Sequence, residues 1–160
     1  FFTKAQDTGS GLFILVHTSN KGSQDLQEIL INRDLKCYEH LANILKPIIE
    51  KNNGKSGLSS IGIVSGATYK EQAISLRRIL PSAPFLIPGY GVQGASASEA
   101  SAPLITDKSY SGLKNFGLIN ASRSILFPQN SYLVNNIKEW QDVILTTLKK
   151  TNDELINTQI

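Results

Sequence analysis

Two stretches of the chain carry groups that can bind an anion, and each follows a short apolar run. The first is the glycine-rich segment from Pro88 to Ala95, which contains Gln93. Its glycines let backbone N–H groups approach an anion closely, and the Gln93 amide can add a neutral donor. The second segment runs from Asn120 to Ser124, where Arg123 lies between two serines. Because arginine offers a fork of donors that matches two phosphate oxygens, the pair of segments favours a phosphate site. Taken singly, a tight strand-to-helix turn explains the first segment equally well, and a surface or ion-paired arginine explains the second better.

A third polar cluster, His17 to Asn20, directly follows the apolar run Leu12 to Val16. A hydroxyl at this place, such as that of Ser19, can read the edge of a nucleotide base. Ser23 fits the role of a helix N-cap, which would leave residues 18–20 facing the site. His17 is expected to pack rather than to catalyse.

The elements that must position these groups are short buried strands, each followed by a segment with helical spacing. The runs do not alternate apolar with polar residues, which is typical of strands covered on both faces. Strands that alternate with helices pair in parallel through right-handed crossovers, either in an open doubly wound sheet or in part of a (β/α)₈ barrel. Four such units would make half of a barrel. The four runs are Leu12–Val16, Ile61–Val64, Phe85–Ile87 and Leu118–Ile119.

Start and stop signals predict the helices. Residues 68–71 and 96–99 both read as capping boxes, in which a hydroxyl and a glutamate satisfy N–H groups of the first turn. Apolar spacing predicts a helix from about Leu35 to Ile49, kinked or restarted at Pro47. It also predicts a long closing helix from about 131 to 156.

Composition excludes several classes of protein. The 160 residues are 41% hydrophobic, and no apolar run approaches the roughly 20 residues that cross a bilayer. The N-terminus lacks the pattern of a secretory signal. One cysteine and two histidines provide neither a disulfide nor a recognisable metal site, which fits a reducing cytosol. The net charge of +3 is scattered and does not indicate a nucleic-acid partner.

Taken together, the four strand ends resemble bacterial-type orotidine 5'-phosphate decarboxylases. The specific part is the series L-I-P-G-Y-G-x-Q-G over residues 86–94, followed by N-x-S-R over 120–123. The likeness extends from about Gly11 to Phe127 and implies strands five to eight of a TIM (β/α)₈ barrel. Residues 1–160 would then be the C-terminal half of one decarboxylase barrel, with the N-terminal half absent from the chain.

The resemblance implies an enzyme that converts orotidine 5'-phosphate to UMP and carbon dioxide without a cofactor. Ser19 matches the serine that hydrogen-bonds the pyrimidine, while Gln93 and Arg123 match the side chains that grip the 5'-phosphate. Backbone at Gly94 and Ser122 would complete that grip. The substrate-binding positions are therefore Ser19, Pro88, Gln93, Gly94, Ser122 and Arg123.

The chain departs from the family at the reacting centre, because it has no Asp-x-Lys-x-x-Asp motif. The segment Asp34 to Glu39 has nearly that spacing but is expected at the start of a helix, as solvated charges. The catalytic lysine is therefore expected on a missing N-terminal half, and a homodimer of completed barrels is implied. A non-catalytic nucleotide-binding module and another sugar-phosphate barrel enzyme remain as alternatives.

Overall fold

A four-stranded parallel sheet forms the centre of the molecule. The computed structural model describes residues 1–106, 114–129 and 131–158. The strands follow the order β1-β4-β5-β8, so β1 and β8 are the edges. All four predicted strands are confirmed, with bounds within two residues of those predicted. The bounds are β1 Leu12–His17, β4 Ile61–Ser65, β5 Phe85–Pro88 and β8 Gly117–Asn120.

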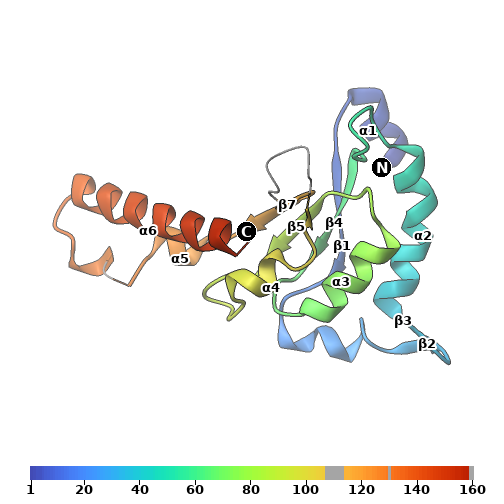
Figure 1. Cartoon of the computed structure of the whole chain (residues 1–160), viewed down its shortest axis with the longest axis horizontal. Helices are drawn as coiled ribbons and strands as arrows, with labels where there is room; N and C mark the ends of the chain where they lie inside the picture. Colours follow the sequence, from blue (N-terminus) through green and yellow to red (C-terminus); the bar gives the residue numbers. More distant parts are fainter. Residues whose placement is uncertain (107–113, 130, 159–160) are drawn as a thin grey trace.

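Helices cover one face of this sheet. The face carries Ile63, Phe85 and Ile87, none of which is exposed to solvent. Helices α2 (Cys37–Lys51) and α3 (Lys70–Ile79) pack over it, and α4 (Ala97–Ser101) contributes Ala100 to the same core (Figure 1). Burying such large apolar side chains is the main favourable contribution to folding.

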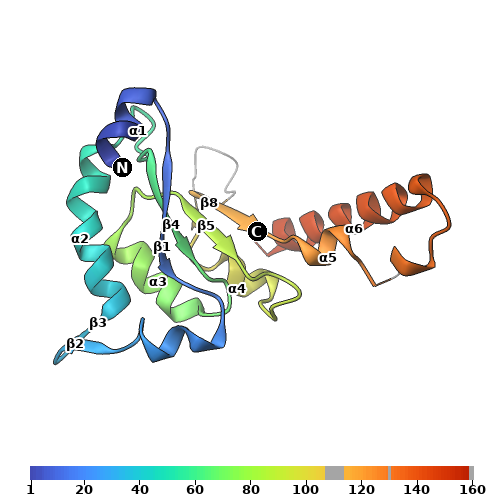
Figure 2. The same cartoon turned by 180° about the vertical axis from the view of Figure 1, so that it is seen from behind.

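No helix covers most of the opposite face of the sheet (Figure 2). One row of side chains crosses all four strands in register, from Leu15 through Val64 and Leu86 to Leu118. The two ends of the row are 54% and 61% exposed, at Leu15 and Leu118 respectively. The structure is thus an α/β protein with a parallel sheet, as predicted, and one sheet face lacks a cover in the described chain.

The first connection contains a hairpin that periodicity did not predict. Strands β2 (Leu30–Asn32) and β3 (Leu35–Lys36) pair antiparallel before α2 begins at Cys37. The segment 34–39 lies at the start of a helix as expected, since Lys36 is the N-cap of α2 and Glu39 is in its first turn. Its first part belongs to the hairpin: Asp34 is in the turn, and Lys36 pairs with Glu28 at 2.9 Å. Helix α2 continues through Pro47 to Lys51, so Pro47 does not end it.

One of the two predicted capping boxes is confirmed and the other is wrong. At α4 the Ser96 hydroxyl accepts from the backbone N–H of Glu99 at 3.2 Å, and the Glu99 carboxylate accepts from the N–H of Ser96. Helix α3 instead has Tyr69 at its N-cap without a side-chain cap. The hydroxyl of Thr68 donates to the backbone oxygen of Ser19 at 2.8 Å, because a tertiary acceptor lies within its reach.

Short elements occupy the remaining connections. Ser23 is not the N-cap of a helix as expected; it is buried inside a 3₁₀ turn. The closing helix starts at 137 rather than 131, where the Asn136 side chain accepts from the N–H of Glu139 at 3.0 Å. No helix within the described ranges is long and apolar enough to cross a membrane. The short elements are α1 (Phe2–Thr8), η1 (Lys21–Asp25), β6 (Ile105–Thr106), β7 (Lys114–Asn115), α5 (Arg123–Leu126) and η3 (Ser131–Leu133), followed by α6 (Ile137–Asn157).

Candidate functional site

The loops at the carboxyl ends of the strands lie along one edge of the sheet, because all four strands are parallel. In such sheets ligands bind at this edge. Ser19 follows β1, Thr68 follows β4, and the glycine-rich segment follows β5. Arg123 begins α5, three residues after the end of β8. The fold therefore brings together residues that are up to about a hundred positions apart in the chain.

Ser19 and Gln93 are in direct contact. The Ser19 hydroxyl donates to Oε1 of Gln93 at 2.5 Å, although 74 residues separate them. A second hydrogen bond fixes the backbone of Ser19, since its backbone oxygen accepts from the Thr68 hydroxyl. A methyl group on Gly66 would lie 2.5 Å from Cα of Ser19, so only glycine allows this approach. The residue expected to read the base is thus linked to a residue expected to hold the phosphate.

The glycine-rich segment after β5 touches the loops on both sides of it. Gly89 has φ 109°, and a Cβ there would lie 3.0 Å from Cβ of Ser19. Gly91 has φ 80°, and a Cβ there would lie 3.0 Å from the hydroxyl oxygen of Ser124. Both positions favour glycine, because L side chains rarely adopt these angles. The loop therefore sits between the β1 loop and the β8 loop.

A small pocket opens between the β5 loop and the β8 loop. Its volume is about 150 Å³. Arg123 and Gln93 are both exposed there, and no acidic side chain lines the pocket within the described chain. A cationic fork and neutral donors without a carboxylate are suited to an anion such as a phosphate group. The lining residues are Pro88, Gly89, Tyr90, Val92, Gln93, Asn120, Ser122, Arg123 and Ser124.

The predicted site residues fall into three groups. Pro88, Gln93, Ser122 and Arg123 line the pocket, and Ser19 reaches it through Gln93. Gly94 lies in the same loop but outside the pocket lining, and its N–H donates to the oxygen of Gly91 at 2.8 Å.

Five further residues line the pocket and were not predicted as site residues, among them Tyr90 and Asn120. Asn120 is the last residue of β8, and its Oδ1 accepts from the Ser122 hydroxyl at 3.3 Å. Both belong to the quoted motifs, so their place in the motif was the available signal.

A buried histidine supports the β1 loop. His17 is fully buried and lies edge-on to the rings of Tyr38 and Tyr69, with centroids 5.2 and 5.0 Å away. Burial lowers its pKa, and the nearby Glu28 carboxylate, 3.5 Å from Nε2, only partly offsets this effect. His17 packs, as expected, and does not reach the pocket.

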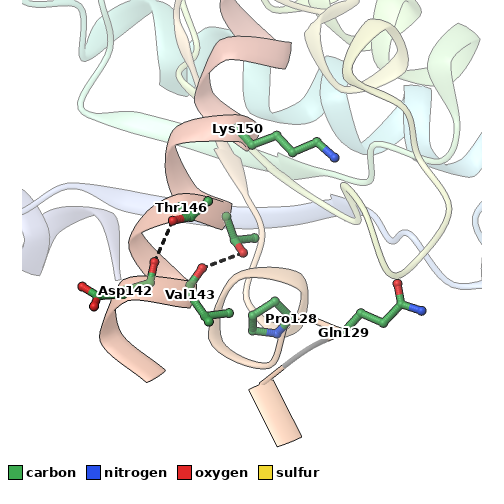
Figure 3. Close-up of a pocket in the computed structure, with 7 residues that line it drawn as sticks. Pro128, Gln129, Asp142, Val143, Thr146 and Lys150 are labelled. Carbon is green, nitrogen blue, oxygen red and sulfur yellow. Dashed lines mark hydrogen bonds between the residues drawn. The ribbon is translucent and has the colours of Figure 1, made fainter. Parts of the chain in front are cut away.

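A larger cavity, of about 470 Å³, lies away from these loops, between residues 128–129 and α6 (Figure 3). Its two threonine hydroxyls are already used, since Thr146 donates to the oxygen of Asp142 and Thr147 to that of Val143, both at 2.8 Å. None of the predicted site residues lines it. Size alone therefore does not identify the functional site here.

No cluster of metal-ligating side chains occurs among the described residues. The fold and pocket together define an α/β protein with an anion-type site at the carboxyl edge of a parallel sheet. No family model matches the sequence.

Comparison with individual proteins gives a narrower result. An orotidine 5'-phosphate decarboxylase of Clostridium kluyveri is 42% identical over 121 residues, which are 76% of this chain and 39% of that protein. One from Rhodopirellula baltica is 30% identical over 149 residues, covering 91% of this chain and 47% of its own length. The structure of an orotidine-monophosphate decarboxylase from Toxoplasma gondii aligns with TM-score 0.66 and 25% identity, over 91% of this chain and 54% of the other.

The chain is thus a relative of the orotidine 5'-phosphate decarboxylases, as the strand-end motifs predicted. It spans about two fifths to one half of the length of the curated relatives that it matches.

Proposed function

We propose that this chain supplies the pyrimidine-binding and phosphate-binding part of an orotidine 5'-phosphate decarboxylase. The observation that carries the proposal is the hydrogen bond from Ser19 to Gln93, next to a pocket that also holds Arg123. Ser19 can then bind the base of a nucleoside monophosphate, while the pocket with Arg123 binds its phosphate. The similarity to decarboxylases over most of the chain supports the same substrate.

In this proposal the chain forms strands five to eight of a (β/α)₈ barrel. The row Leu15, Val64, Leu86 and Leu118 would then face the barrel interior, where layers of apolar side chains fill the space. Strands β1 and β8 would pair with strands of an N-terminal half and lose their exposed edges. The open apolar face of the sheet is consistent with such a cover.

The reaction breaks the bond between C6 of the pyrimidine and its carboxylate, which leaves as carbon dioxide. The electron pair stays on C6 and takes a proton from a lysine. That lysine is assigned to the missing half, because this chain has no Asp-x-Lys-x-x-Asp motif. Gln93 and Arg123 would act at a distance, by using phosphate binding energy to organise the site. No cofactor is needed.

The proposed assembly is a homodimer of completed barrels in the cytoplasm. The single cysteine, Cys37, is unpaired, which fits a reducing compartment.

A binding experiment separates this function from its alternatives. Calorimetry with UMP should show that Arg123→Ala weakens binding by about 1.5–3 kcal/mol, the range for hydrogen bonds to charged groups. Arg78→Ala, on the exposed side of α3, serves as the matched control and should leave the affinity unchanged. Equal affinities in the two variants would remove the phosphate assignment.

Ser19→Ala distinguishes a nucleotide site from a sugar-phosphate site. The variant should weaken UMP binding much more than ribose 5-phosphate binding, because both ligands lose the support that Ser19 gives to Gln93 but only UMP carries a base. Equal losses for the two ligands would favour another sugar-phosphate enzyme. A non-catalytic binding module would give the same results in both binding experiments, but it would not decarboxylate the substrate even when combined with other segments.

A further inference from the structure

One side chain of the phosphate pocket is tied to the far end of the chain. Tyr90 lines the pocket and is buried, and its hydroxyl donates to Oε2 of Glu154 at 2.8 Å. Glu154 belongs to α6, 64 residues later. Both views show α6 projecting away from the sheet, with its C-terminal end nearest to the body (Figures 1 and 2). No residue of α6 is buried, although Leu155 packs against the core, and the Tyr90 bond adds a polar contact with the body.

Backbone hydrogen bonds hold the β5 loop together from within. Contacts with other segments must therefore set its orientation. The N–H groups of Gly91, Gly94 and Ala95 all donate to oxygens within the loop. On the side of β1 the loop is fixed through Gln93, which accepts from Ser19. On the other side the Tyr90 hydroxyl provides the corresponding fixed point.

The Tyr90 ring belongs to the hydrophobic core, while its hydroxyl reaches α6. A cavity of about 400 Å³ lies beside this contact, lined among others by Tyr90, Gly91, Ser124, Lys150, Thr151 and Glu154. Because this space is not filled by side chains, the hydrogen bond fixes the hydroxyl end of Tyr90 where apolar contacts are few. Helix α6 also contacts α5, the helix that starts with Arg123. The same helix therefore supports both loops that form the phosphate pocket.

We infer that Tyr90 and Glu154 are positioning residues, through which α6 holds the β5 loop at the right distance from Arg123 to grip a phosphate group. The inference rests on the proposed function and deepens it. Helix α6 thereby becomes part of the phosphate site without touching the ligand.

The charge state of the pair fits this role. Burial, followed by the neighbouring Glu154 carboxylate, raises the pKa of Tyr90 to about 12. The hydroxyl therefore keeps its proton at neutral pH and can donate. Glu154 is not part of the phosphate pocket lining, so its negative charge lies behind Tyr90 and away from the bound anion.

Four variants of the chain test the inference by calorimetry with UMP and with ribose 5-phosphate. Tyr90→Phe keeps the ring and removes the donor, Glu154→Ala removes the acceptor, and Glu154→Gln keeps an acceptor oxygen. Asp153→Ala removes the adjacent exposed carboxylate and is the matched control. Urea unfolding of each variant at the temperature of the titration shows that all of them are folded there, so that a loss of stability is not mistaken for a loss of affinity.

We expect Tyr90→Phe and Glu154→Ala each to weaken the binding of both ligands by about five- to twentyfold, the effect of about one hydrogen bond. Glu154→Gln and Asp153→Ala should stay within about twofold of the unaltered chain. A Tyr90→Phe protein that binds both ligands normally would overturn the inference while leaving the proposed function intact. A loss confined to UMP would also overturn it, because the effect would then act at the base. Failure of the unaltered chain to bind either ligand would overturn both.

Discussion

Arg77 offers the sharpest test of how the fold is held together. The residue is only 9% exposed, and its guanidinium has no carboxylate partner among the described residues. Instead it donates to backbone oxygens. It also lies 3.8 Å from the centroid of the Phe85 ring. The chain segments that it joins are the end of α3, the approach to β5, the end of α4 and the residue before β8. The three shortest bonds reach Pro103 at 2.7 Å, Ala83 at 2.7 Å and Phe116 at 2.8 Å.

The replacement Arg77→Met keeps much of the side-chain volume and removes every donor. The buried oxygens of Pro103 and Ala83 then lose a partner, at about 1–3 kcal/mol for each unsatisfied group. The oxygen of Phe116 keeps the bond that it accepts from the N–H of Phe85. The removal of a buried charge and its desolvation cost offsets part of this loss. We therefore expect the free energy of unfolding to fall by about 3–5 kcal/mol, which is at the upper end for one substitution.

Urea unfolding followed by circular dichroism measures this change, with Arg78→Met as the control. Arg78 is the next residue of α3 and is exposed, so its replacement should change the free energy of unfolding by no more than about 0.5 kcal/mol. Equal unfolding midpoints for the two variants would refute the argument that Arg77 joins the four segments.

Two further predictions concern the β1 loop. Burial lowers the pKa of His17 from 6.5, so its contribution to stability is complete above that pH and is lost as the pH falls. Between pH 7 and 5.5 the unfolding free energy should therefore fall more steeply in the unaltered chain than in His17→Gln; parallel curves would contradict this. A Cβ at Gly66 would lie 2.5 Å from Cα of Ser19, so Gly66→Ala should destabilise the chain by about 1–3 kcal/mol and weaken UMP binding. Gly54→Ala, whose new Cβ would be 3.5 Å from its nearest neighbour, should do neither, and similar effects of the two changes would argue against a tight Ser19 contact.

The sheet could be predicted from the sequence because its strands are short, buried and separated by helical segments. Continuous apolar runs such as Phe85 to Ile87 have no other simple explanation in a chain of this length. The hairpin at residues 30–36 was not predicted, because its apolar residues are exposed and show no alternation that points to a core. The prediction of a capping box at Thr68 was wrong for a different reason. Its hydroxyl donates to the backbone oxygen of Ser19, 49 residues away.

The candidate site was predictable as a set of residues, but not as a geometry. The motifs identified Gln93 and Arg123, and parallel topology implied that they would meet at one edge. The hydrogen bonds from Ser19 to Gln93 and from Tyr90 to Glu154 join residues at separations of 74 and 64, with no local pattern to reveal them. Such contacts depend on how the loops fold over the sheet.

The most direct test of the account is a decarboxylation assay with orotidine 5'-phosphate, followed by loss of substrate absorbance. The purified chain would be assayed alone and after addition of the N-terminal half of a related decarboxylase, with Arg123→Ala in parallel. The account predicts turnover only in the mixture, and much slower turnover with the variant. Turnover by the chain alone would contradict the assignment of the catalytic lysine to another segment, and an assembled but inactive mixture would contradict the decarboxylase function.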